Sequence, residues 1–385
     1  MSVKKRLPVL MILALLCWAC SLEGNIFDIS HSVPTDSSGP SVGPGGDGDG
    51  GGGGGVPDPV EELQWANTNW YYNNPYASDF YISTPEELAG LSNLVNKGIG
   101  LSGKTIHQTN DIDLSVYDNW MPIGIIDENY FFTGIFDGGG YTISNLTIYR
   151  FDDSSHGLFG RIMSGAVVKN LKLINVNING NYCIGSVVGL NLGIVENCYV
   201  EGNVSSNYYS IGGIVGDNMG MVNNCSFCGN VSGNENVGGV VGLNFNGTIE
   251  KCYAIGNVFG YSEIGGIVGL SNYGIIKNCV ALNDTVTSTY YEEANIGRVT
   301  CMTDAGTLQN NYSNLDMVIK YNTYSTYIPA DTIHADDNKD GADVSPGTNA
   351  GQCNNQSWWI GTVGFDFSAS GPWKWDDVVN LPILK

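Results

Sequence analysis

Cysteine recurs at a fixed interval in the middle of the chain. Cys198, Cys225, Cys252 and Cys279 follow one another every 27 residues, and apolar residues keep the same spacing. An unvarying period of small and β-branched residues predicts a solenoid, because each coil can bury its inner face only by stacking on its neighbours. The apolar columns are Val168, Val195, Val222, Ile249 and Ile276; Leu171 followed by the four cysteines; Leu173, Val200, Phe227, Ala254 and Ala281; and Val204, Val231, Val258 and Thr285.

Each coil is predicted to be β-structure. The repeated phrase IGGIVG, at residues 211–216, consists of β-branched residues and glycine, and pairs such as Gly212 and Gly213 permit bends or close backbone approach. Charged residues make up 14 % of the chain and there are 53 glycines, a composition typical of strands and turns. We therefore expect an all-β fold, a right-handed parallel β-helix with about 27 residues per coil and strands about 4.8 Å apart.

Asparagine marks the predicted corners. Two inward columns that lie three residues apart need a corner between them, and asparagine tolerates the left-handed backbone that a corner requires. A second asparagine column follows the glycine of each GNV turn, and its amides can hydrogen-bond from coil to coil. The corner column is Asn170, Asn197, Asn224, Lys251 and Asn278, and the second column is Asn203, Asn230, Asn257 and Asp284.

The cysteine column is expected to be a row of packed, free thiols. It begins with Leu171, so the site accepts an apolar side chain, and a buried thiol behaves as one. Side chains that run parallel on stacked coils oppose disulfide geometry. The alternative, a redox or zinc pair at Cys225 and Cys228, lacks a second CxxC and a nearby histidine. We assign no role to Cys183, Cys301 and Cys353.

A helix is predicted to cover the first coil. Residues 83–98 place Thr84 as the N-cap, Pro85 first in the helix, Glu87 in a capping box and Gly98 beyond the end. An open β-helix end would otherwise invite pairing with other chains. The face toward the coil would comprise Leu88, Leu91 and Val95.

A C-terminal cap is expected to close the last coil, and with it four parts of the chain are predicted. Residues 1–19 form a signal peptide, 20–60 a Gly- and Pro-rich tether without fixed structure, 61–330 the β-helix with its N-terminal cap and repeats over about 157–315, and 331–385 the C-terminal cap. The residues expected to close the last coil are Trp358, Trp359, Trp373 and Trp375 and the segment 381–384.

The N-terminus predicts export and lipidation. Lys4, Lys5 and Arg6 precede an apolar run that is short for a membrane span, and Ala19 precedes Cys20. This order resembles a bacterial lipoprotein signal, which implies cleavage before Cys20, acylation of its new N-terminus and a surface-exposed position on the outer membrane. The alternative is an ordinary cleaved signal in which Cys20 has no role.

The charge balance restricts the partners. Loss of the three basic signal residues leaves 13 Lys and Arg against 38 Asp and Glu, a net charge of −25. Phosphate backbones and anionic polysaccharides need clustered cations, so we expect no nucleic-acid partner and no polyanion. Contact with a membrane is expected through the lipid anchor only, and the chain is expected to be a monomer that requires no cofactor.

The repeats resemble the GLUG-motif family of bacterial surface β-helices. Four copies carry the likeness: IGSVVGLNLGIVENCY, IGGIVGDNMGMVNNCS, VGGVVGLNFNGTIEKCY and IGGIVGLSNYGIIKNCV. It extends over about residues 80–315, and KWDDVVNLPIL resembles the usual closing strand of such proteins. The resemblance implies a parallel β-helix of the kind found in adhesin-like lipoproteins of Bacteroidetes and in the non-catalytic part of IgA-cleaving metalloproteases. It supplies no catalytic residues. No HExxH surrounds His31, His107, His156 or His334, which excludes the metalloprotease chemistry.

An enzyme that degrades polysaccharides is the main alternative. Parallel β-helices also host lyases and hydrolases, and hydrolysis needs two carboxylates that face one groove. The string FDDSSHGLFGRI holds suitable residue types within a single turn, whereas such enzymes draw them from successive coils, so a solvated turn is the simpler interpretation. Those residues are Asp152, Asp153, His156 and Arg161.

One short segment resembles part of a calcium loop. Asp336, Asn338 and Asp340 have the spacing of its first half, but Gly347 stands where a bidentate glutamate would be expected. A weak structural calcium site and a plain acidic turn are both compatible with this sequence.

The candidate binding surface lies in the loops that precede each IGG strand. These loops would stack along one edge of the solenoid, where tyrosine rings can stack on sugars and carboxylates can bond hydroxyl groups. Turn packing between coils is the alternative. The candidate residues are Tyr208, Tyr209, Glu235, Tyr261, Glu263, Tyr290 and Tyr291.

These observations together predict a lipid-anchored, non-enzymatic surface solenoid. It would act as an adhesin or ligand-binding protein for a glycan or for a host or microbial surface protein. The other possibilities are the polysaccharide-degrading enzyme and a spacer without a ligand of its own.

Overall fold

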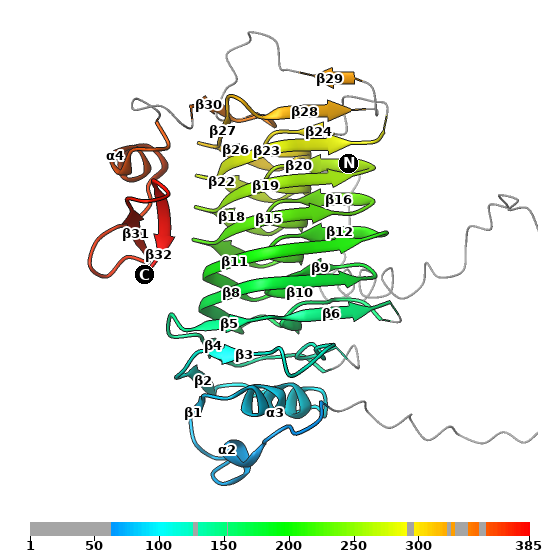
Figure 1. Cartoon of the computed structure of the whole chain (residues 1–385), viewed down its shortest axis with the longest axis vertical. Helices are drawn as coiled ribbons and strands as arrows, with labels where there is room; N and C mark the ends of the chain where they lie inside the picture. Colours follow the sequence, from blue (N-terminus) through cyan, green and yellow to red (C-terminus); the bar gives the residue numbers. More distant parts are fainter. Residues whose placement is uncertain are drawn as a thin grey trace, which may run out of the picture. The chain divides into compact units, whose positions relative to one another are not determined.

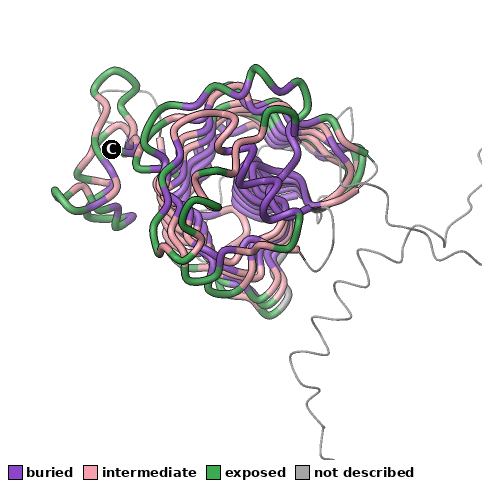
Figure 2. The backbone as a smooth tube through the Cα atoms, turned by 90° about the horizontal axis from the view of Figure 1, so that it is seen from below, coloured by how far each residue is buried: buried purple, intermediate pink, exposed green. Residues whose placement is uncertain are grey.

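A computed structural model describes residues 63–125, 130–151, 153–290, 296–321, 325–327, 338–345 and 352–385. These residues form a parallel β-solenoid, as predicted, with its strands stacked from coil to coil (Figure 1). Viewed along its axis, buried backbone lines the inside of the wall and exposed residues lie on the corners (Figure 2).

Three parallel sheets build the wall of the solenoid. The first contains β1 (Asp79–Ile82), β2 (Thr105–Gln108), β3 (Ile112–Asp113), β4 (Ile135–Asp137), β5 (Thr142–Ser144), β6 (Thr147–Arg150), β8 (Val167–Gly180), β11 (Ile194–Ser206), β14 (Met221–Asn223), β15 (Ser226–Ser232), β18 (Thr248–Glu250), β19 (Tyr253–Gly260), β22 (Ile275–Lys277), β23 (Val280–Ser288), β26 (Thr307–Gln309), β27 (Tyr312–Asn314), β28 (Val318–Tyr321) and β30 (Ala342–Val344), with β29 (Ser325–Tyr327) added antiparallel to β28. The second contains β7 (Phe159–Ile162), β10 (Val188–Asn191), β13 (Val215–Asn218), β17 (Val241–Phe245), β21 (Val268–Asn272) and β25 (Thr300–Asp304). The third contains β9 (Ile184–Gly185), β12 (Tyr209–Gly212), β16 (Glu235–Gly238), β20 (Ser262–Gly265) and β24 (Ile296–Gly297).

The predicted corner column is confirmed. All five of its members have left-handed backbone, which turns the strand between two inward side chains. Their φ angles are 54° at Asn170, 53° at Asn197, 51° at Asn224, 53° at Lys251 and 56° at Asn278.

The predicted inward columns pair as expected except at one bulge. Val204, Val231 and Val258 lie in register, but an irregularity in β23 pairs Asn257 with Thr285 and Val258 with Val286. Thr285 and Asp284 are therefore not members of the valine and asparagine columns, because the extra residue moves each pairing one position along the chain.

The N-terminal helix forms where it was predicted. Helix α3 (Pro85–Val95) follows the short α2 (Asn69–Tyr72), and the Thr84 hydroxyl accepts a hydrogen bond from the Glu87 amide. The Glu87 carboxylate accepts from the Ser83 amide at 2.7 Å. The apolar side chains of α3 belong to the same hydrophobic core as the first coils, so this helix covers the N-terminal end of the solenoid (Figure 1).

The opposite end is held by a buried arginine. The Arg298 guanidinium, only 1 % exposed, pairs with the Asp343 carboxylate and donates to the carbonyls of Asn314 and Gly341. The same segment supplies β30, which pairs with β27. Residues 338–344 therefore form the partial turn that ends the described solenoid.

The prediction that the tryptophans close the last coil is wrong. Residues 352–385, which we call the C-terminal clasp, lie against the outer side of the solenoid (Figures 1 and 2). The clasp comprises α4 (Gln356–Trp358), the π-helical turn Trp359–Val363, and the antiparallel pair β31 (Trp373–Asp376) and β32 (Leu381–Leu384). Its aromatic residues pack on outward side chains of the first sheet, where Tyr253 and Val280 offer an apolar surface.

Candidate functional site

The tyrosine-rich loops stack along one edge, as predicted. The Asn234 amide donates to the Tyr208 carbonyl at 2.8 Å, and the Tyr261 amide donates to the Asn234 carbonyl at 2.6 Å. The Tyr290 amide continues the row by donating to the Tyr261 carbonyl at 3.0 Å. Successive coils thus present their side chains at one corner. We call this surface the tyrosine ridge; its described members are Tyr182, Tyr208, Tyr209, Glu235, Tyr261, Glu263 and Tyr290.

The rings of the ridge contact one another and remain accessible. Tyr182 and Tyr209 stack with centroids 5.2 Å apart and an interplanar angle of 7°. Tyr261 and Tyr290 meet edge to face at 5.2 Å. Tyr208 is 47 % exposed and Tyr261 42 % exposed, so part of each ring faces solvent.

Tyr182 was missed from the sequence. It stands 27 residues before Tyr209, so the same period that aligned the cysteines would have found it. Tyr291, which was predicted to belong to the ridge, lies outside the described residues.

Two carboxylates accompany the rings. Glu263 has left-handed backbone with φ 55° and is half-buried. Burial raises the pKa of its carboxyl, Glu235 raises it further, and a hydrogen bond from Ser262 partly offsets both. Glu263 is therefore more readily protonated than a solvated glutamate, and it can accept or donate a hydrogen bond.

Of the candidate hydrolase residues that the structure describes, Asp153 alone is a carboxylate, so they provide no pair of carboxylates. His156 is fully buried, with its Nε2 3.1 Å from the Asp153 carbonyl, and Arg150 lies 3.4 Å from the Asp153 carboxylate. Arg161 donates to the Ser155 hydroxyl at 3.3 Å. Asp153 Oδ1 and His156 Nδ1 are buried and have no hydrogen-bond partner among the described residues, and Asp152 lies outside them.

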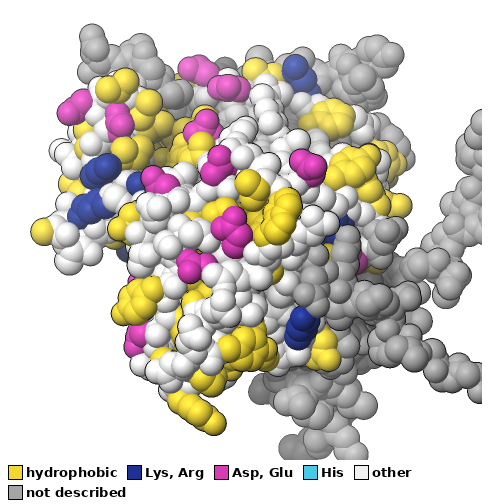
Figure 3. All heavy atoms as spheres, turned by 60° about the horizontal axis from the view of Figure 1, so that its bottom comes forward, with side chains coloured by type: hydrophobic (Ala, Val, Ile, Leu, Met, Phe, Trp, Pro, Cys, Tyr) yellow, Lys and Arg dark blue, Asp and Glu magenta, His cyan; other side chains and the backbone are white. Residues whose placement is uncertain are grey.

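Among the described residues, the N-terminal end shows no carboxylate cluster that could hold a metal ion. Figure 3 shows acidic side chains there singly or in pairs among polar and hydrophobic ones.

The segment that resembles a calcium loop is folded by its own hydrogen bonds. The Asn338 side-chain oxygen accepts from the amides of Asp340 and Gly341, and the Asp340 carboxylate accepts from the Arg298 amide at 3.0 Å. Asp336 lies outside the described residues. Among those described, no group of three or more His, Cys, Asp or Glu side chains could hold a metal ion.

The cysteine column consists of free, buried thiols, as predicted. Each thiol donates to the carbonyl two residues earlier, at 3.3 Å for Cys198 and 3.2 Å for Cys225. Burial raises the pKa of the Cys225 thiol well above its usual value, which suppresses the reactive thiolate. Cys183 donates to the buried carboxylate of Asp217 at 3.0 Å.

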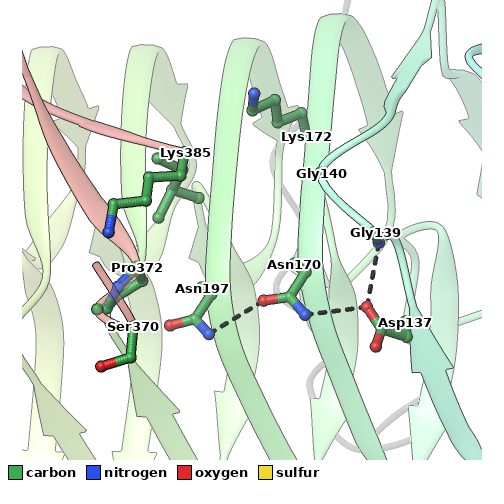
Figure 4. Close-up of a pocket in the computed structure, with 11 residues that line it drawn as sticks. Asp137, Gly139, Gly140, Asn170, Lys172, Asn197, Ser370, Pro372 and Lys385 are labelled. Atoms are coloured by element: carbon green, nitrogen blue, oxygen red, sulfur yellow. Dashed lines mark hydrogen bonds between the residues drawn. The ribbon is translucent and has the colours of Figure 1, made fainter. Parts of the chain in front are cut away.

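A second candidate site is a groove of about 390 Å³ between the clasp and the early coils, which we call the C-terminal groove (Figure 4). Along its floor Asn197 donates to the Asn170 side-chain oxygen at 3.1 Å, and Asn170 donates to the Asp137 carboxylate at 2.9 Å. The solenoid contributes Asp137, Gly139, Gly140, Asn170, Lys172 and Asn197, and the clasp contributes Ser370, Gly371, Pro372, Leu384 and Lys385.

The solenoid side of this groove carries two charged groups, Asp137 and Lys172, and they differ in how far neighbouring groups stabilise their charge. Burial alone would raise the pKa of Asp137, but hydrogen bonds from Asn170 and Gly139 and the Lys169 ammonium lower it overall. Burial lowers the pKa of Lys172, Lys374 lowers it further, and the Asp111 carboxylate opposes both only in part. The carboxylate is thus stabilised as an anion, whereas the Lys172 ammonium is not fully compensated.

The repeated coils match a known motif. The GLUG motif matches residues 180–205 and 233–258, each of which runs from one ridge loop through the corner to the next outward strand. These two coils are GLUG repeats. The solenoid that contains them, which we call the GLUG solenoid, thus includes a unit that recurs in other proteins, in agreement with the resemblance drawn from the sequence.

Two longer proteins share part of the GLUG solenoid. Halomucin of Haloquadratum walsbyi is 38 % identical over 153 residues, which cover 37 % of this chain and 2 % of halomucin. A protein of Evansella cellulosilytica, provisionally named a Gly-rich membrane protein, is 32 % identical over 136 residues, covering 33 % of this chain and 14 % of that protein. The chain thus spans only a small fraction of either relative. Both carry names of membrane or surface proteins.

One solved structure has the same fold. It is a crystal structure of a protein from Bacteroides ovatus, provisionally described as an immunoglobulin A1 protease, with a TM-score of 0.61 and 20 % identity. The match covers 80 % of this chain and 92 % of that one. At this identity the likeness supports the architecture alone. No helix in the described part of the chain is both long and apolar enough to cross a membrane.

Proposed function

We propose that this chain is a non-enzymatic surface lipoprotein whose tyrosine ridge binds glycan chains. The observation that carries the proposal is the recurrence of tyrosine rings at one corner of the GLUG solenoid. Tyr182, Tyr208 and Tyr209 lie on two adjacent coils, the next coil carries Glu235 in their place, and Tyr261 and Tyr290 follow on the two coils after it. Tyr208 and Tyr261 are exposed. Rings held in a row can stack on successive sugar residues, and the neighbouring carboxylates can bond hydroxyl groups.

Attachment to the outer membrane through acylated Cys20 is part of this proposal. The signal and the tether lie outside the described residues, so support comes from the order of residues around Cys20 and from the names of the two relatives. A Cys20→Ser variant should move the protein from the membrane fraction to the soluble fraction. Equal membrane retention of the variant would contradict lipid anchoring.

The ridge is tested with paired tyrosine variants. Tyr208→Ala and Tyr261→Ala should each weaken retention on a bound glycan by about three- to tenfold, the effect expected when one aromatic contact is lost. Tyr273→Ala is the matched control, because Tyr273 is 53 % exposed and contacts Phe245 at a different corner. Unchanged affinity in both ridge variants would refute the role of the ridge.

The binding assay should use a panel of glycans, and each glycan should also be examined for cleavage. Plant, mucin and microbial glycans incubated with the protein, with calcium or with chelator, should be retained intact if the chain only binds. Shortened products would instead support the polysaccharide-degrading alternative. Binding to a surface protein remains a second proposed mode, and retention by protein ligands but by no glycan would favour it.

We also propose a weak structural calcium site. It would order the segment around Asn338 and Asp340, and a chelator-dependent loss of thermal stability would support it.

A further inference from the structure

The amide ladder on the outer face is interrupted at the C-terminal groove. Asn170 and Asn197 continue the ladder from Asp137, but at the next coil Asn224 accepts a hydrogen bond from the Trp373 indole at 3.3 Å. The Asn197 side-chain oxygen is buried and has no hydrogen-bond partner in the described part of the chain. A buried acceptor without a partner is costly, and because this oxygen has almost no accessible surface, a donor could reach it only after a small shift of the Asn197 amide or the clasp.

Cations gather at the same groove in a strongly acidic chain. Lys172 lines it from the solenoid and Lys385 from the clasp (Figure 4), and Lys374 lies close enough to disfavour the charged form of Lys172. Within the described residues Lys172 forms no ion pair, whereas Asp137 is already bonded to Asn170 and the Gly139 amide. An added anionic group would therefore gain a charge-assisted contact with Lys172 without displacing an existing partner.

The size and remaining lining of the groove restrict the ligand. A volume of about 390 Å³ falls in the range of small-molecule sites. Polar groups dominate the floor, and only Pro372 and Leu384 add apolar surface. A ligand that fits would carry several hydroxyl groups together with one anionic group. The net charge of −22 disfavours a long polyanion, but it does not oppose one anionic residue held among lysines.

We propose that the C-terminal groove binds a single carboxylated sugar residue, with its carboxylate at Lys172 and its hydroxyl groups against the polar floor formed by Asn170 and Asn197. The site is separate from the tyrosine ridge and does not depend on it. The groove would thus recognise an acidic sugar residue at the end or at a branch of a glycan.

The test uses methyl glycosides of glucuronic and galacturonic acid and a methyl sialoside, each paired with an analogue that has a hydroxymethyl group in place of the carboxylate. Calorimetric titration of the whole mature chain should show saturable binding of at least one acidic glycoside and at least about tenfold weaker binding of its neutral partner, as expected for one charge-assisted hydrogen bond. Lys172→Met, which keeps the apolar stem, should weaken acidic binding by a similar factor.

Two further variants make the test specific. Ser370→Tyr, at an exposed position on the rim, should block the groove without removing a charge. Lys320→Met removes an exposed lysine on β28 and should leave binding unchanged. Equal binding of acidic and neutral glycosides, no binding of any acidic glycoside, or equal losses in Lys172→Met and Lys320→Met would each overturn the proposal. Ridge variants should bind normally here, so a failure of the ridge is distinguished from a failure of the groove.

Discussion

The indole Nε1 of Trp373 donates a hydrogen bond to the side-chain oxygen of Asn224 across 149 residues of sequence. Nearby, the Tyr253 hydroxyl donates to the Pro382 carbonyl at 2.5 Å. These two contacts attach the end of the chain to the middle of the solenoid. They also mark where the outer face stops being available to solvent or ligand.

Removal of the Trp373 side chain should release the clasp. Trp373 is fully buried and stacks on Phe365 with centroids 4.8 Å apart, so Trp373→Ala should cost about 3–5 kcal/mol of packing. Limited proteolysis should then cut within residues 352–385 while the solenoid stays intact. Trp375→Ala, at a half-buried position, is the control and should be cut much more slowly. Identical digestion of both variants would show that Trp373 does not hold the clasp.

Loss of Arg298 should expose the end of the solenoid. Its guanidinium is buried, and replacement leaves the Asp343 carboxylate and two carbonyls without their donor. Arg298→Met should therefore destabilise the chain by about 1–3 kcal/mol, the usual cost of leaving buried acceptors unsatisfied, because the Asp343 side chain is 35 % exposed and stays partly solvated. Hydrogen exchange should show lost protection first at residues 338–344. Protection there equal to that of the parent would contradict the assignment.

His156 should make the first coils sensitive to acid. It begins an inward column that continues with Ile184, Ile211, Val237, Ile264 and Ile296. Burial, which outweighs the opposing effect of Asp153, lowers its pKa below the ordinary 6.5. Below pH 6.5 the unfolded chain therefore binds a proton that the folded chain does not, so stability should fall as pH drops through that value.

His156→Ile should abolish this part of the pH dependence, because isoleucine matches the rest of the column. Denaturant unfolding at pH 7 and pH 5 measures the difference directly. His107→Gln, at a partly exposed histidine, serves as control and should keep the acid loss. A parent protein equally stable at both pH values would rule out the effect.

Replacement of Asp217 by an apolar residue should stabilise the folded chain. It is buried between Leu190 and Leu243 of the neighbouring coils, and burial raises the pKa of its carboxyl. Asp217→Leu should stabilise the chain at pH 7 by about 0.5–2 kcal/mol, in the range of favourable single substitutions. The gain should shrink as pH falls toward 3.8 and disappear below that value, where the carboxyl is protonated in both states. A loss of stability at pH 7 would show that the hydrogen bonds from Cys183 and Ser210 outweigh the burial cost.

The repeated part of the fold could be predicted because every coil restates the same constraint. Asn170 to Asn278 all turn the chain at the same point, and even Lys251 adopts the left-handed angle there. Asp284 could not be placed, because the bulge in β23 adds a residue that counting by 27 does not detect. The clasp could not be placed either, because no period relates Trp373 to Asn224.

The candidate sites, too, could be predicted from the sequence only where they lie within the repeat. The tyrosine ridge lies within the repeat, so most of its members were found from the sequence. The C-terminal groove combines Lys172 of an early coil with Lys385 at the end of the chain, and that combination depends on a contact that only the folded structure contains.

The attachment of the clasp also restricts how the protein can change in length. The chain leaves the last coil near Val344 and returns to the coils of Asn224 and Tyr253. Duplication of one coil between these points would move the exit about 4.8 Å further from the coils that the clasp contacts. Duplication on the N-terminal side of Asn197 leaves this distance unchanged. Gain or loss of repeats during evolution should therefore be concentrated in the first half of the solenoid.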